Sequence, residues 1–174
     1  QHNGKTYALN DLNLDVKEGE IFGLLGPNGA GKTTFINILA GTVIKTEGEV
    51  NVCGFDLDEN PRQVRASVGV VPQEVNLDPF FSPRKLLDLQ AGLYGVKEKD
   101  RITDTILNLV SLEKEANSYA RSLYGGMKRR LLMAKALVHQ PPLVFLDEPT
   151  AGVDVELRQN LWKNVRMLNK LGVT

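Results

Sequence analysis

A glycine-rich stretch near the start of the chain has the residue types and spacing that bind a triphosphate. It fits G-x-x-x-x-G-K-[ST], in which glycines let backbone N–H groups approach phosphate oxygens closely. Lys32 is placed to contact the β- and γ-phosphates, and the hydroxyl of Thr33 is placed to bind Mg²⁺. A following helix would add the positive end of its dipole. The predicted phosphate site consists of Gly26, Pro27, Asn28, Gly29, Ala30, Gly31, Lys32, Thr33 and Thr34.

Two adjacent acids in the second half of the chain could complete this site. Asp147 and Glu148 directly follow the apolar run 143–146, which is typical of a buried strand. A strand that ends in a carboxylate can aim it at phosphates on a neighbouring loop. We therefore expect Asp147 to hold Mg²⁺ and Glu148 to orient or deprotonate the attacking water. Gln73 ends another apolar run, and its amide could contact both Mg²⁺ and the water.

The strands that must position these residues are predicted from hydrophobic periodicity. Apolar runs at 21–25, 67–71 and 143–146 indicate strands buried on both faces. Alternation at 12–16 and 49–52 indicates half-buried strands in a small antiparallel sheet beside the site.

From residue 76 to residue 140 the pattern becomes helical. Ser82 is the predicted N-cap of a helix that has Pro83 at its first position. The basic run 128–130 is interpreted as a solvated face or a phosphate neighbourhood, because its side chains point in different directions on a helix. Three apolar helix faces are predicted, namely Leu86, Leu89 and Leu93; Ile102, Ile106, Leu109 and Val110; and Leu131, Ala134, Leu137 and Val138.

Composition argues against several classes of function. The 21 basic and 21 acidic residues cancel, so no global field attracts nucleic acid, and none is expected as a partner. The apolar runs are far too short to span a membrane. Cys53 is the only cysteine, which excludes an internal disulfide, and its apolar neighbours predict that it is buried.

The order of these motifs resembles the ATP-binding cassette (ABC) family across essentially the whole chain. The family's signature, Leu-Ser-Gly-Gly-Gln, corresponds here to Leu-Tyr-Gly-Gly-Met at 123–127. The resemblance implies an α/β P-loop NTPase fold with a parallel core sheet, a small antiparallel β subdomain and an inserted α-helical subdomain. It implies a single domain, with a nucleotide-binding core at 1–75 and 141–174 and a helical subdomain at 76–140.

The resemblance also assigns roles, with ATP and Mg²⁺ as cofactors. Two cassettes of the family dimerise head to tail, so Asp154 would connect the two sites. The catalytic set would be Lys32, Gln73 and Glu148, and the metal ligands would be Thr33, Gln73 and Asp147. The residues that close over the partner's γ-phosphate would be Leu123, Tyr124, Gly125 and Gly126.

Several positions depart from the family pattern. Tyr124 replaces the signature serine, and Met127, followed by basic residues, resembles the drug and ABC-2-type exporter branch. Tyr7 is the aromatic residue nearest to the usual adenine-stacking position, although its register suits a strand. The family's switch histidine would lie beyond Thr174, so we expect weak or no turnover from these residues alone.

The motifs fit three functions to different degrees. The leading hypothesis is the ATPase subunit of a membrane exporter, at the cytoplasmic face, with a permease partner contacted near Gln73 and 78–82. The alternative is a soluble ABC ATPase acting on ribosomes or DNA, but the tandem cassettes or coiled-coil insertions of such proteins are not seen in this sequence. A P-loop kinase or GTPase is disfavoured by Glu148, by the Gly-Gly helix entry and by the lack of Asn-Lys-x-Asp.

Overall fold

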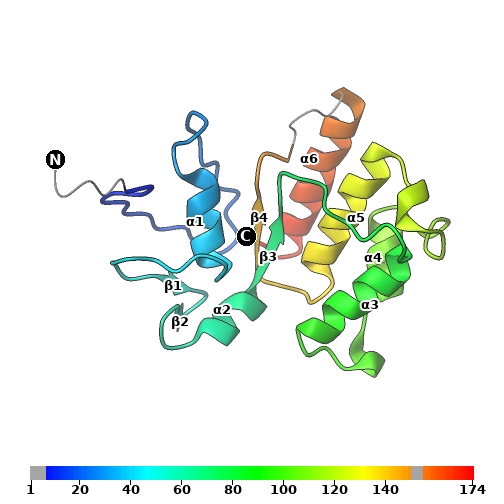
Figure 1. Ribbon diagram of the computed structural model, residues 1–174, viewed down its shortest axis with the longest axis horizontal. Helices are drawn as coiled ribbons and strands as arrows, with labels where there is room; N and C mark the ends of the chain where they lie inside the picture. Colours follow the sequence, from blue (N-terminus) through cyan, green and yellow to red (C-terminus); the bar gives the residue numbers. More distant parts are fainter. Residues whose placement is uncertain (1–6, 150–154) are drawn as a thin grey trace.

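The computed structural model describes residues 7–149 and 155–174 (Figure 1). The expected role of Asp154 therefore lies outside the described residues. Helix α1 and the β1–β2 hairpin lie on one side of strands β3 and β4, and helices α3, α4 and α5 lie on the other. In chain order the elements are α1 (Lys32–Leu39), β1 (Asn51–Val52), β2 (Phe55–Asp56), α2 (Pro61–Ser67), β3 (Val68–Val71), α3 (Pro83–Leu93), the 3₁₀ turn η1 (Glu98–Asp100), α4 (Thr103–Leu109), the 3₁₀ turn η2 (Ala120–Ser122), α5 (Gly125–Leu137), β4 (Leu143–Leu146) and α6 (Val155–Lys170).

Strands β3 and β4 form a parallel pair, as expected from the two apolar runs. The register aligns Val68 with Leu143 and Val71 with Leu146. The N–H of Asp147 donates to the carbonyl of Val71 at 3.0 Å and continues the ladder by one step. Because parallel strands end at the same edge of a sheet, this pairing brings the residues after β3 next to those after β4.

The antiparallel hairpin confirms one predicted strand, but this strand pairs with a different segment from the one predicted. Strand β1 pairs with β2, so that Val52 faces Phe55, and not with residues 12–16. Cys53 and Gly54 form the turn with φ angles of 52° and 83°, a left-handed conformation that short hairpins require. The prediction that Cys53 is buried was wrong, because Cys53 lies in the turn, outside the paired residues, and is exposed.

Residues 12–16 and 21–25 were predicted to be strands, and this prediction was wrong. Neither segment pairs with another strand among the described residues, and Leu25 is 94% exposed. The backbone beside β4 is instead that of Thr174, whose carbonyl accepts from the N–H of Val144 at 2.9 Å. A cavity of about 1910 Å³ is lined both by 12–16 and 21–25 and by β4. An apolar run predicts burial, but a strand also needs a neighbouring backbone to pair with.

Helix α2 was not predicted from the sequence. Ser67, expected to start a strand, is the last residue of this helix. The available signal was Asn60 followed by Pro61, since proline is favoured at the first helical position.

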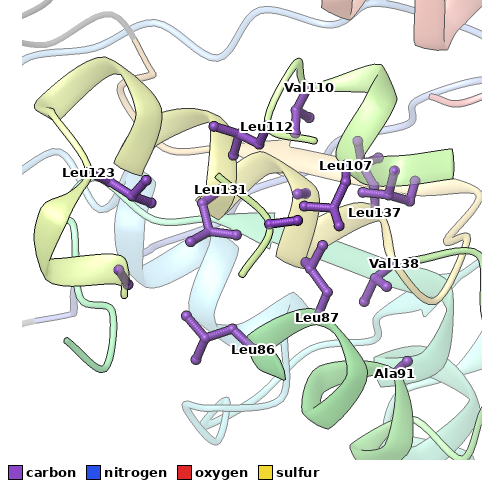
Figure 2. Close-up of a cluster of buried hydrophobic side chains, with 14 residues drawn as sticks. Leu86, Leu87, Ala91, Leu107, Val110, Leu112, Leu123, Leu131, Leu137 and Val138 are labelled. Atoms are coloured by element: carbon purple, nitrogen blue, oxygen red, sulfur yellow. The ribbon is translucent and has the colours of Figure 1, made fainter. Parts of the chain in front are cut away.

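Helices α3, α4 and α5 pack around one apolar core, shown in Figure 2. The predicted faces of α4 and α5 are confirmed, and the hydroxyl of Ser82 caps α3 by accepting from the N–H of Lys85 at 3.3 Å. The predicted face of α3 was largely wrong, because Leu89 and Leu93 are exposed. The helix instead turns Leu87 and Ala91 toward α4 and α5, together with Leu86. The spacing of leucines alone did not distinguish these two neighbouring faces.

Candidate nucleotide site

The phosphate loop, residues 26–34, leads into α1 through a left-handed glycine. Gly31 has a φ of 88°, and a Cβ atom there would collide with the carbonyl oxygen of Ala8. Both facts restrict this position to glycine. Among the described residues no side chain caps α1, so the N–H groups of its first turn are free to meet an anion.

Lys32 lies folded over its own loop. Its ammonium group donates to the carbonyl oxygens of Gly26, at 2.8 Å, and Pro27, at 3.0 Å. The cation is therefore held directly against the backbone that would surround the phosphates. Phosphate oxygens would be stronger acceptors than these neutral carbonyls, because the resulting hydrogen bonds are charge-assisted on both sides.

A hydrogen bond joins the phosphate loop to the end of β4. The hydroxyl of Thr33 donates to Oδ2 of Asp147 at 2.9 Å, and Asp147 is only 6% exposed. Hydroxyl and carboxylate oxygens are the hard ligands that Mg²⁺ prefers, so these two side chains fit such an ion. In the described part of the chain no group of three or more His, Cys, Asp or Glu could hold a metal, so phosphate and water oxygens would complete the coordination.

Gln73 and Glu148 meet at the carboxyl ends of β3 and β4. The amide nitrogen Nε2 of Gln73 donates to Oε2 of Glu148 at 2.9 Å, across 75 positions of sequence. Glu148 has a φ of 45°, a left-handed conformation that costs about 1–2 kcal/mol for a residue with a side chain. Such strain is typical of functional positions, where the surrounding structure holds the backbone in place.

In the described part of the chain, no hydrogen bond joins the signature residues to the phosphate loop. Tyr124 is 79% exposed just before α5, and Gly125 is exposed as its first residue. The side chain of Leu123 is buried in the helical core, so only its backbone could face a ligand. None of Leu123, Tyr124, Gly125 and Gly126 lines the cavity beside residues 26–34. Hydrogen bonds within one copy of the chain join Thr33 to Asp147 and Gln73 to Glu148, and among the described residues none of them reaches the signature.

Tyr7, the candidate adenine stacker, is half-exposed and lines the same cavity as Gly26 and Lys32. It does not lie in a strand. Its stacking role stays a prediction.

Arg129 is a residue of this site that sequence reasoning missed. The run 128–130 was interpreted as a solvated or phosphate-facing surface, yet Arg129 is 8% exposed and contacts backbone carbonyls. Its position on α5 was the available signal. It lies three and four residues before the buried Leu132 and Met133, on the same helix face.

Comparison with known proteins agrees with this geometry. The family model described as "ABC transporter" matches residues 9–151. The ATP-binding protein I of Nod factor export from Cupriavidus pinatubonensis is 42% identical over 98% of this chain and 53% of its own length. The protein of the same name from Burkholderia thailandensis is 42% identical over 96% of this chain and 56% of its own length. The chain thus spans about half the length of the curated relatives it matches.

Solved structures show the same likeness. A dimeric structure of MJ0796, a bacterial ABC transporter cassette, aligns with a TM-score of 0.84 and 28% identity over 100% of this chain and 80% of that one. A dimeric post-hydrolysis state of the same cassette, bound to ADP and Pi, aligns with a TM-score of 0.82 and 30% identity over 97% of this chain and 78% of that one. The chain belongs to the ABC transporter family, and its fold is that of the family's ATP-binding, P-loop NTPase cassettes.

Proposed function

We propose that the chain binds MgATP as part of the energy-coupling subunit of a membrane ABC transporter, and that the full-length subunit hydrolyses ATP to export a substrate. The observation that carries this proposal is the pair of hydrogen bonds at the ends of β3 and β4. One joins Thr33 to Asp147, and the other joins Gln73 to Glu148. A glycine-rich turn unrelated to nucleotide binding would not be expected to contact a buried carboxylate. It would also not be expected to lie at the same sheet edge as a Gln–Glu pair.

Each residue has a defined part in the proposed reaction. The backbone of 26–34 and the ammonium of Lys32 bind the phosphates and stabilise the charge that develops on them. Thr33 and Asp147 would hold Mg²⁺, which would supply positive charge to neutralise the phosphates. Gln73 orients the attacking water through its amide, and the carboxylate of Glu148 accepts the proton of that water.

Magnesium removal tests the proposal directly. With Mg²⁺ present, the full-length protein should release phosphate from ATP, and an excess of EDTA should reduce that rate to the buffer background. The measurement is a continuous phosphate-release assay, with restoration by added Mg²⁺ as the control. Turnover that persists in EDTA would contradict the assignment of Thr33 and Asp147 as metal ligands.

The export role is supported by the names of the relatives, and the permease partner is supported by an exposed aromatic surface at Phe80 and Phe81. The relatives carry names of an export system. None of the helices described by the structure is long and apolar enough to cross a membrane. Phe80 is 68% exposed and Phe81 is also exposed at the entry to the helical subdomain, where we place the permease contact. The chain would then act at the cytoplasmic face of the membrane.

A head-to-tail dimer would complete the site, because Tyr124 and Gly125 are exposed and, among the described residues, make no hydrogen bond to the phosphate loop of their own chain. In this arrangement the exposed start of α5 closes over the nucleotide bound by the other copy. We therefore propose residues 123–126 as the part of the ATP site that the partner supplies.

Tyr124→Ser tests this closure. Serine removes a ring that would hold the two subunits apart, so the ATP-dependent dimer of the full-length protein should become at least about threefold tighter. Sedimentation velocity with and without ATP measures the effect, and Tyr119→Ser, also an exposed tyrosine of the helical subdomain, is the matched control. A weaker dimer in Tyr124→Ser would show that the ring itself is an interface contact.

A further inference from the structure

Arg129 is a buried cation whose hydrogen-bond partners among the described residues are all backbone carbonyls. It is 8% exposed, and its guanidinium donates to the carbonyls of Gln73 at 2.6 Å, Glu148 at 3.0 Å and Pro72 at 3.2 Å. A longer contact of 3.4 Å reaches the carbonyl of Pro149. Removing a buried charge from water is unfavourable unless it is well hydrogen-bonded, so this arrangement needs the carbonyls to stay in place.

These carbonyls come from two different segments. Pro72 and Gln73 follow β3, whereas Glu148 and Pro149 follow β4. The planar fork of a guanidinium can hold both segments at once, because its donors point in fixed and divergent directions. Arg129 thus connects the backbones of the two residues whose side chains are joined by the Gln73–Glu148 hydrogen bond.

The contact to Glu148 acts on a strained residue. With φ at 45°, the backbone of Glu148 must be held by its surroundings, and its carbonyl accepts from Nη2 of Arg129. The direction of the carboxylate depends on that backbone conformation. Loss of the arginine would therefore let the carboxylate turn away from the water without removing any group that touches the nucleotide.

Arg129 also lies one helical turn into α5. The helix begins at the exposed Gly125, and the N–H of Lys128 donates to the carbonyl of Tyr124 at 3.0 Å in its first turn. A shift of this end of the helix would displace the guanidinium relative to both strand ends. The start of α5 and the hydrolytic residues are therefore mechanically joined through one side chain.

We propose that Arg129 is a positioning residue that sets the geometry of Gln73 and Glu148 and couples it to the start of α5. The inference rests on the proposed function, in which Gln73 and Glu148 act on the attacking water and residues 123–126 meet the partner's nucleotide. Docking of α5 against the second subunit would then bring the hydrolytic pair of the same chain into its reactive arrangement.

Arg130 supplies a matched control. It is the next residue of the same helix, and its Nη1 donates to the carbonyls of Val110 and Ser111, both at 2.8 Å. Both arginines bond backbone carbonyls from α5, but those of Arg130 lie in the helical subdomain, far in sequence from Gln73 and Glu148. A general loss of stability should therefore appear when either arginine is substituted, whereas a loss of positioning should appear only when Arg129 is substituted.

The experiment compares Arg129→Lys and Arg129→Gln with Arg130→Lys in the full-length protein. A lysine keeps the charge but cannot reach both strand ends, so kcat should fall by about 10–100-fold while the Kd for ATP changes by less than about 2-fold. Arg130→Lys should keep kcat within about 2-fold of the parent. Phosphate release gives kcat and KM, calorimetry gives Kd, and urea unfolding compares the stabilities. If Arg129→Lys fails to fold, Arg129→Gln, which retains neutral donors, provides the same comparison.

Equal losses of kcat in the two lysine variants, or a loss of ATP affinity that accounts for the fall in rate, would overturn the inference. Glu148→Gln separates it from the proposed function. If Glu148→Gln abolishes hydrolysis while Arg129→Lys retains it, the positioning role alone fails. If Glu148→Gln hydrolyses normally, the proposed function fails. When Arg129→Lys is combined with Glu148→Gln, the rate should fall no further than in Glu148→Gln alone, because the two changes affect one group.

Discussion

Glu148→Gln in the full-length protein should abolish steady hydrolysis while leaving ATP binding intact. A positioned general base contributes about 10²–10⁴-fold to rate, and an amide cannot accept the proton of the attacking water. The substituted amide oxygen can still accept from Nε2 of Gln73, so the local geometry at the end of β4 should be retained. We expect the phosphate-release rate to fall by at least about 100-fold.

The same substitution should also trap a dimer when ATP is added. Hydrolysis releases the nucleotide that joins two cassettes, so a chain that binds ATP without cleaving it should accumulate as the ATP-bound dimer. Size-exclusion chromatography with ATP measures this state, and Glu113→Gln, an exposed acid in the helical subdomain, is the control. Normal turnover in Glu148→Gln would show that another group is the base.

Lys32→Ala should weaken MgATP binding by about 10–150-fold. A hydrogen bond to a charged group contributes about 1.5–3 kcal/mol, which corresponds to that range of affinity. In the structure the ammonium bonds the carbonyls of Gly26 and Pro27, so the group is already held within the loop that binds the phosphates. Isothermal titration calorimetry of the full-length protein measures the change.

Lys45→Ala is the control for this prediction. Lys45 forms an ion pair with Asp58 at 2.6 Å near the hairpin, and Asp58 is largely exposed. Such a pair contributes at most about 1 kcal/mol to stability and has no assigned part in binding phosphate. Unchanged affinity in Lys32→Ala, or an equal loss in Lys45→Ala, would contradict the placement of Lys32 beside the phosphates.

The candidate site was largely predictable because its residues belong to short motifs with local geometry. The phosphate loop needs a left-handed glycine before a helix, and Gly31 has that conformation. Asp147 and Glu148 follow an apolar run that does form a strand, and β3 pairs with it in parallel. The meeting of Gln73 with Glu148 then follows from the rule that parallel strands end at one edge. Their placement was expected, while their roles remain proposals.

The errors arose where a local pattern had several possible partners. Residues 12–16 and 21–25 have the apolar character of strands, but pairing depends on which backbone lies beside them, and Thr174 occupies the position next to β4. Leu89 and Leu93 share a helical stripe with Leu86, yet α3 turns Leu87 and Ala91 toward the core. Spacing identifies candidate faces but not which of them meets the rest of the protein.

The sequence by itself identified the phosphate loop, the paired acids and the helical block. Each of these features depends on residues that are close together in the sequence. The fold alone showed that Arg129, one of three consecutive basic residues, is buried against the carbonyls of Gln73 and Glu148. A charge run on a helix predicts solvent exposure, and only the packing of α5 against the ends of β3 and β4 provides carbonyls that can hold a buried guanidinium.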